Sequence, residues 1–159
     1  SHGSVMTQVL AMALTDLFAA AAPCSGILFQ MPDMNIRELP ELKNRADIEL
    51  PIWMFGGEQE PWLLPHIPAA DNETGDSICI WRGINHMEPE MPENFTEGWT
   101  VNGRWHDLTY RRSDGAPMVN FTWVDYMPHA TMTEMSFRIW EEFFSKFSRE
   151  NGKVCYHPN

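Results

Sequence analysis

The sequence predicts a domain of the α/β class, in which helices cover the faces of a sheet. Three observations lead to this prediction. Apolar residues recur at three- and four-residue steps near the first residue, which is the spacing of one helical face. Two short apolar runs follow, each closed by glycine. A hairpin pattern then precedes a second helical stripe near the last residue.

The first 26 residues are predicted to form a helix and then a buried strand. The expected apolar face of the helix consists of Val5, Met6, Val9, Leu10, Ala13, Leu14 and Leu17. The following run, FAAAAPCSG, has no alternation of apolar and polar residues, as in a parallel strand that is covered on both faces. Ser25-Gly26 closes this run.

A second buried strand is predicted over residues 48–55, ending at a Gly-Gly pair. Two carboxylates follow it, Glu58 and Glu60. An α/β sheet presents its functional groups just beyond the carboxyl ends of its strands, so these acids are candidates for a site. Residues 61–103 are rich in Pro, Asn and Glu and are predicted to be mostly loop, with a helix near Gly75–Met87.

The last third of the chain is predicted to form a hairpin and a closing helix. Two extended runs flank the turn signal at residues 113–115. From Thr131 the pattern is helical, and Gly152 is the expected end of this helix. The expected apolar stripe on it consists of Phe137, Trp140, Phe144 and Phe147.

Composition narrows the classes of partner. At 159 residues the chain is predicted to be one domain. Its 11 basic and 22 acidic residues give a net charge of −11, which argues against binding of nucleic acids or of anionic membrane surfaces. The apolar runs are too short to span a membrane. Three scattered cysteines without metal-ligand spacing favour free thiols and predict no metal, and a Cys79–Cys155 disulfide remains open.

Three side chains that are suited to acyl transfer occur along the chain in the order serine, acid, histidine. Ser1, His2 and Gly3 directly precede the first helix, Glu60 follows a strand, and His129 lies between the hairpin and the last helix. In α/β-hydrolases a nucleophilic serine, an acid and a histidine occur in this order, with the serine in a G-x-S-x-G turn before a helix. We therefore predict Ser1 as nucleophile, His129 as base, Glu60 as the acid that orients it, and the backbone N–H of His2 as an oxyanion donor. No cofactor is required.

Longer stretches resemble one branch of that fold, the polyhydroxybutyrate depolymerases and feruloyl esterases. Residues 1–26 resemble the helix after the nucleophile and the strand that follows it. PIWMFGGEQEPW is similar to the family's strand ending in His-Gly-x-x-Asp, YMPHA to its histidine loop, and FRIWEEFFSKF to its closing helix. The resemblance implies the C-terminal half of an α/β-hydrolase sheet, with an elbow helix, parallel strands, a late β-hairpin and a closing C-terminal helix.

The resemblance also implies an activity and partners. Residues 1–159 would form a single domain that is incomplete at its N-terminus and inactive without the missing N-terminal half, or a second chain, which supplies the other oxyanion donor. The expected substrate is a carboxylic ester of polyester, feruloyl or acetyl-sugar type. Trp62 is the candidate substrate contact, and either its indole N–H or a backbone amide after Gly57 is expected to donate to Glu60. A secreted or periplasmic location is favoured over others.

Several alternatives remain open at this stage. The family's acid is Asp rather than Glu, so Glu58 and Asp125 are rivals of Glu60, with Glu58 expected on the opposite side of an extended segment. Ser1 could instead be a remnant of an expression tag, or the nucleophile of an N-terminal-nucleophile hydrolase that uses its own α-amine as base. The chain could also be a non-catalytic hydrolase fragment or a binding module.

Overall fold

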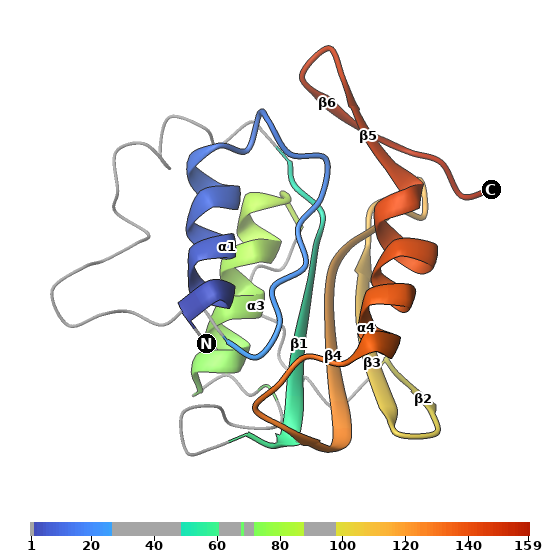
Figure 1. Ribbon diagram of the computed structural model, residues 1–159. Coiled ribbons are helices and arrows are strands. Elements are labelled where there is room, and N and C mark those ends of the chain that lie inside the picture. Colours follow the sequence, from blue (N-terminus) through green and yellow to red (C-terminus); the bar gives the residue numbers. More distant parts are fainter. Residues whose placement is uncertain (1, 27–48, 61–67, 69–71, 88–97) are drawn as a thin grey trace, which may run out of the picture.

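The computed structural model describes residues 2–26, 49–60, 68, 72–87 and 98–159. Within them a four-stranded sheet in the order β1-β4-β3-β2 lies between helices (Figure 1). Strands β1 and β4 are parallel, whereas β3 and β2 continue the sheet antiparallel. The mixed sheet with helices agrees with the predicted α/β class. The strands are β1 (Ile52–Gln59), β2 (Trp99–Asn102), β3 (Trp105–Arg111) and β4 (Pro117–Pro128), and the α-helices are α1 (His2–Ala13), α3 (Glu73–Ile84) and α4 (Thr133–Arg138).

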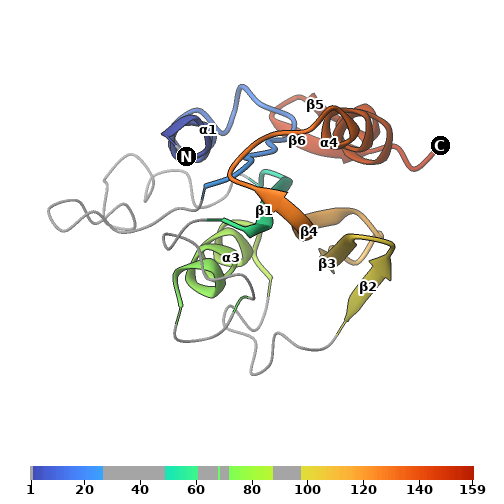
Figure 2. The same ribbon diagram turned by 60° about the horizontal axis from the view of Figure 1, so that its bottom comes forward.

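The molecule has three layers. Helices α1 and α4 lie on one face of the sheet and α3 lies on the other (Figure 2). The segment after α1 forms an edge segment, residues 21–26, along the side of β1 that faces away from β4. Ala21 pairs there with Ile52 and Cys24 with Phe55, both in parallel. The strand expected in FAAAAPCSG therefore exists as two isolated bridges, and it extends the sheet beyond β1.

Strand β1 is the centre of the core. Its residues Ile52 to Phe55 are all buried because helices cover both faces of the sheet, as expected for a parallel strand without alternation. The predicted end of this strand was wrong, since β1 continues through Gly56 and Gly57 to Gln59. The glycines do not end the strand; instead, Gly57 lets it pass close to β4. Other fully buried large side chains are Trp81, Phe143, Leu50, Ile78, Leu108, Met118, Met127 and Met135.

The buried face of α1 differs from the predicted one. Met6 and Leu10 are 57% and 41% exposed, whereas the polar residues Ser4 and Gln8 are buried. Apolar periodicity thus identified the helix but not its orientation. Helix α1 turns Ser4, Gln8, Ala11 and Met12 toward the protein.

Hydrogen bonds account for this polar face. The Ser4 hydroxyl donates to the carbonyl oxygen of Gly26 at 2.7 Å, and the Gln8 side-chain amide donates to the same oxygen at 3.4 Å. The Gln8 carbonyl oxygen accepts from the indole N–H of Trp81 at 2.9 Å. Buried polar groups are costly unless they are paired, so these contacts fix α1 against the edge segment and α3.

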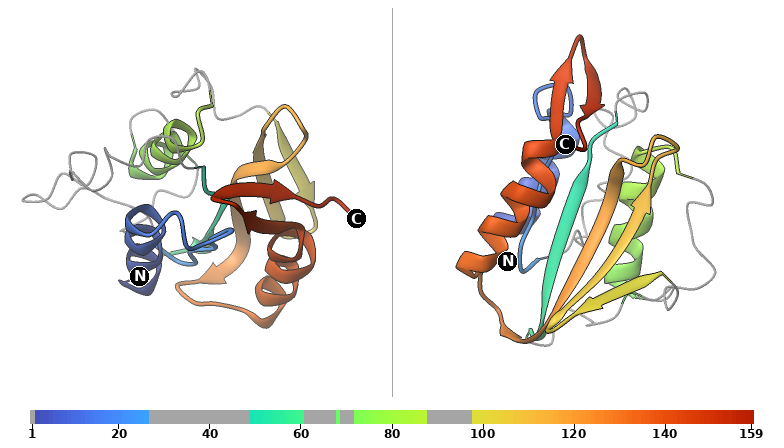
Figure 3. Two further views of the ribbon diagram at one scale, coloured as in Figure 1. Left: turned by 90° about the horizontal axis from the view of Figure 1, so that it is seen from above. Right: turned by 90° about the vertical axis from the view of Figure 1, so that its right-hand side faces the viewer.

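The carboxyl-terminal region corrects two expectations. The predicted helix ends before Gly152, which has φ +79° in the turn of a hairpin (Figure 3). The expected aromatic stripe mostly faces outward, with Phe137 and Trp140 62% and 63% exposed. The side turned to the sheet carries Phe143, whose ring meets Trp53 edge-on at 5.6 Å. After α4 the chain forms a π-helical turn η2 (Ile139–Phe143), a 3₁₀ turn η3 (Phe144–Lys146), and strands β5 (Phe147–Glu150) and β6 (Lys153–Tyr156).

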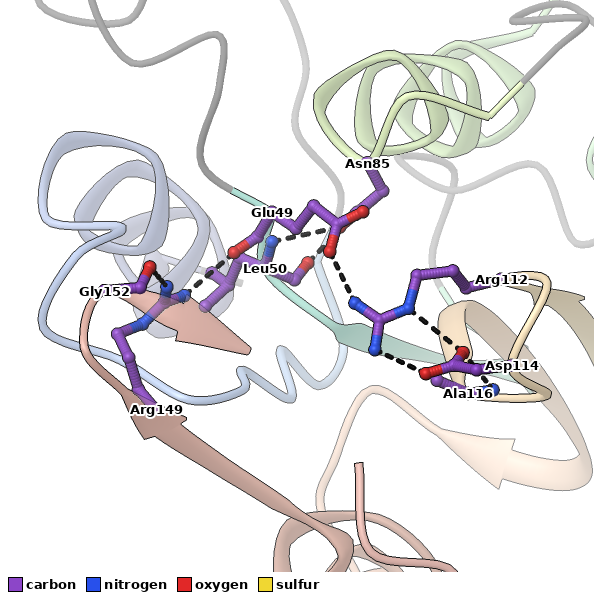
Figure 4. Close-up of polar contacts among 8 residues, drawn as sticks. All are labelled: Glu49, Leu50, Asn85, Arg112, Asp114, Ala116, Arg149 and Gly152. Atoms are coloured by element: carbon purple, nitrogen blue, oxygen red, sulfur yellow. Dashed lines mark hydrogen bonds and ion pairs between the residues drawn. The ribbon is translucent and has the colours of Figure 1, made fainter. Parts of the chain in front are cut away.

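Polar contacts from three directions fix the start of β1 (Figure 4). The side-chain amide of Asn85, at the end of α3, exchanges two hydrogen bonds of 2.9 Å with the backbone of Leu50. Arg112 pairs with the carboxylate of Glu49 at 2.5 Å, and Arg149 donates to the Glu49 carbonyl at 2.8 Å. These contacts fix the residues that precede β1. The position of the other end of β1 then depends on the pairing between β1 and β4.

At that far end the register between β1 and β4 shifts. Gly57 pairs with Val124, but Gln59 pairs with Pro128, so two steps along β1 match four along β4. Tyr126, within the extra residues, has φ +59°. Such a left-handed residue inside a strand is typical of a bulge, which bends the strand and redirects the chain after it.

Gly57 makes this bulge possible. A Cβ atom at Gly57 would lie 2.2 Å from the carbonyl oxygen of Met127, which no real side chain tolerates. At the neighbouring Gly56 the nearest atom to such a Cβ is a ring carbon of Phe121, at an ordinary 3.6 Å. Only the second glycine of the pair is therefore required for the close approach of the two strands.

We predict that Gly57→Ala lowers the free energy of unfolding by at least about 2 kcal/mol, because the Met127 backbone must move away. The matched change Gly56→Ala, one residue earlier, should stay within about 1 kcal/mol of the parent protein. Urea denaturation of the two variants compares them directly. Equal changes in unfolding free energy would contradict the steric account.

Candidate active site

The candidate site lies at the end of the sheet where the parallel strands finish, and three chain segments end there. The edge segment ends just after Ser25, β1 ends beside Glu60, and β4 leads into His129. Helix α1 also begins on this side of the molecule (Figures 1 and 3). Carboxyl ends of parallel strands converge in this way, and α/β proteins place their ligands there.

Glu60 and His129 are in direct contact. One carboxylate oxygen of Glu60, Oε2, is hydrogen-bonded to Nδ1 of the His129 ring. The Glu60 side chain is only 1% exposed, whereas the His129 side chain is 34% exposed. The sequence predicted this contact between residues 69 positions apart, and the structure contains it.

The geometry of the pair suits a general base. With Nδ1 held by the carboxylate, the other ring nitrogen of His129, Nε2, is available to a second group, and the partly exposed ring leaves room for one. Oε1 of Glu60 is buried without a hydrogen-bond donor from the described residues. Trp62, the donor and substrate contact expected from the sequence, lies outside the described residues.

Glu58 has a role that the sequence analysis did not anticipate. Its carboxylate accepts a hydrogen bond of 2.7 Å from the backbone N–H of Tyr126, the left-handed residue of the bulge. Glu58 is therefore not a partner of His129 but an anchor for the strand that precedes it. The pattern of residues gave no sign of this contact, because nothing in the sequence of β4 marks the register shift.

Asp125, the other rival acid, also has a different partner. Its carboxylate lies 3.0 Å from Nε2 of His106, and both side chains are partly exposed. Its backbone N–H donates to the carbonyl oxygen of Arg104 at 2.8 Å. Asp125 is therefore bonded to His106 and Arg104, at the start of β3, and not to His129. Of the three candidate acids, the structure brings only Glu60 to His129.

The predicted nucleophile, Ser1, lies outside the described residues. His2, the predicted oxyanion donor, is the first residue of α1 and its side chain is exposed. Because the first N–H groups of a helix have no partner within it, they are suited to binding an anion. The contacts of Ser4 and Gln8 hold α1, so the place of its first turn is set by the fold.

All three cysteines are free thiols, as the sequence analysis favoured. Cys24 lies closest to the site in sequence, next to Ser25. Burial raises the pKa of its thiol to about 11, so at neutral pH it is protonated and a poor nucleophile.

Within residues 2–26, 49–60, 68, 72–87 and 98–159, His, Cys, Asp and Glu do not gather in groups of three that could hold a metal ion. In the same described residues, every helix is too short or too polar to cross a membrane.

Comparison of the chain with models of known protein families and with curated proteins gives no match. The central feature of the site is a buried carboxylate on one nitrogen of a partly exposed imidazole.

We predict that Glu58→Ala weakens the bulge and Glu58→Gln largely preserves it. Glutamine keeps an oxygen that accepts from the Tyr126 N–H, whereas alanine leaves that N–H to water. Alanine should lower the free energy of unfolding by about 1 kcal/mol, and glutamine by clearly less. Hydrogen exchange of the Tyr126 amide reports on the same bond. An amide equally protected in both variants would show that the carboxylate does not hold the bulge.

Proposed function

We propose that this protein is a serine hydrolase of carboxylic esters, with Ser1 as nucleophile, His129 as base and Glu60 as the acid that orients the imidazole. The observation that carries the proposal is the Glu60–His129 hydrogen bond through Nδ1. A histidine held in this way by a buried acid is the activating half of a catalytic triad. Triads are recognised by such geometry rather than by position in a sequence.

The proton and acyl transfers of the proposed reaction use these three groups and water. The Ser1 hydroxyl attacks the ester carbonyl carbon as its proton passes to Nε2 of His129. The tetrahedral oxyanion then expels the alcohol, which takes the proton from Nε2. Water attacks the acyl-enzyme by the same route, releasing the carboxylic acid and restoring Ser1. Glu60 stabilises the imidazolium that forms in each half of the reaction.

The start of α1 supports the proposed oxyanion site. The backbone N–H of His2 lies in the first turn of α1, where N–H groups and the helix dipole favour negative charge. Preorganised donors of this kind stabilise charge that develops on the substrate oxygen. In the proposal a second donor comes from polypeptide outside residues 1–159, so the activity belongs to the complete protein.

We also propose that the sheet is the C-terminal half of an α/β-hydrolase sheet. Support comes from the order of the parts: helix α1, an edge segment, β1 followed by Glu60, β4 followed by His129, and α4. The parallel pairing of the edge segment, β1 and β4 agrees with this assignment. A helix beginning at His2 favours this proposal over an N-terminal-nucleophile hydrolase, whose serine is expected to open a strand.

Hydrolysis of short-chain p-nitrophenyl esters by the full-length protein, without added metal, tests the proposal. Ser1→Ala and His129→Ala should each lower kcat by about 10⁴-fold or more, and the double variant should lose little more, because the two residues act as a unit. Glu60→Gln should lower kcat by about 10³- to 10⁴-fold without unfolding the protein.

His157→Ala is the matched control for these variants. His157 also lies near a carboxylate, that of Glu150 at 3.8 Å, but it is exposed and follows β6. Its loss should leave kcat unchanged. Full activity after Ser1→Ala would refute the assignment of the nucleophile, and equal losses in His157→Ala and His129→Ala would refute that of the base.

A further inference from the structure

Ser25 adopts a backbone conformation that is unusual for a residue with a side chain. Its φ is +55°, in the left-handed region where a Cβ atom is disfavoured. It is 4% exposed, and its backbone N–H donates to the carbonyl oxygen of Phe55 in β1 at 2.9 Å. Glycine would occupy this position without strain, so the serine side chain requires a separate explanation.

The hydroxyl of Ser25 contacts the histidine loop. Its Oγ donates a hydrogen bond of 2.7 Å to the carbonyl oxygen of Ala130, the residue directly after His129. Ser25 and Ala130 are 105 positions apart in the chain. This single side chain therefore ties the end of the edge segment to the backbone that carries the imidazole.

A second contact holds the loop on its other side. Glu58 accepts from the N–H of Tyr126, three residues before His129. His129 thus lies between two side-chain anchors, one from β1 and one from the edge segment. Neither anchor touches the imidazole ring itself in the described structure; both act on the backbone that positions it.

We propose that Ser25 is a positioning residue for His129, acting through the Ala130 carbonyl to keep the imidazole in line with Glu60. The expected effect of Ser25 on turnover rests on the proposed function. The expected effect of Ser25 on the geometry of the Glu60–His129 pair does not depend on any reaction. Catalytic geometry tolerates little displacement, because a misplacement of about 1 Å can cost about a hundredfold in rate.

Two substitutions separate positioning from simple stabilisation of the fold. Both Ser25→Gly and Ser25→Ala remove the hydroxyl, but only glycine also relieves the strain at φ +55°. The urea midpoint should therefore be higher for the glycine variant than for the alanine variant. If Ser25 positions His129, both variants should nevertheless lose kcat to a similar extent, about ten- to a hundredfold, with KM little changed.

Thr15→Val is the matched control. The Thr15 hydroxyl is also buried and donates to a backbone carbonyl, that of Met12, at the same 2.7 Å. It lies just past the last residue of α1, whereas the site lies by the first. Its loss should lower the urea midpoint but leave kcat unchanged.

Proton NMR supplies a readout that does not depend on turnover. The Nδ1 proton of His129, shared with Glu60, should give a downfield resonance in the parent protein and in Thr15→Val. In Ser25→Gly and Ser25→Ala this resonance should broaden or exchange faster with water. Assignment follows from its absence in a His129→Gln variant.

The outcomes are distinct. An unchanged resonance in Ser25→Gly, or a loss of kcat in the Ser25 variants no larger than in Thr15→Val, would overturn the role of Ser25. If the parent protein hydrolyses no ester, the proposed function fails, and the resonance alone still decides whether Ser25 positions His129.

Discussion

Strands β1 and β4 approach each other at Gly57 so closely that the Met127 carbonyl occupies the space of a side chain. This approach allows the extra residues of β4 to bulge, with Tyr126 in a left-handed conformation. A regular continuation of the parallel ladder would keep the two chains in constant register, and Glu60 would then face a residue before His129. The register shift carries His129 forward to Glu60, so the candidate site depends on the absence of one Cβ atom.

The other end of the site is organised by polar rather than apolar packing. Helix α1 is held through the buried side chains of Ser4 and Gln8, which meet the Gly26 carbonyl and the Trp81 indole. Directional bonds of this kind fix a helix both along and about its axis, whereas an apolar stripe tolerates sliding. In the proposed function this precision matters, because the first N–H groups of α1 would stabilise negative charge.

The sequence predicts the structure correctly where a functional pattern coincides with the end of a strand. Glu60 and His129 were predicted to meet because a serine, an acid and a histidine follow one another in the order found in α/β-hydrolases, with the acid just beyond a strand end. A helix near residues 75–87 was also expected and corresponds to α3, and the turn signal at residues 113–115 predicted the β3–β4 hairpin. These features depend on local sequence and on the general geometry of parallel sheets.

The remaining features depend on contacts between distant residues, and the sequence did not reveal them. Hydrophobic periodicity misplaced the buried face of α1 because Gln8 is satisfied by Trp81, 73 positions away. The roles of Glu58 and Ser25 require the bulge and the left-handed backbone, which no local motif announces. The chain after η3 turns into a hairpin at Gly152, a residue that ends helices and forms turns equally well.

The central claim is that the Glu60–His129 pair activates Ser1. A fluorophosphonate probe, which bonds to activated serine hydroxyls, tests it by peptide mass spectrometry on the full-length protein. The account predicts one adduct, on Ser1, formed rapidly in the parent protein and at least about a hundredfold more slowly in His129→Ala. An adduct on another serine, or labelling of Ser1 at the same rate without His129, would contradict it.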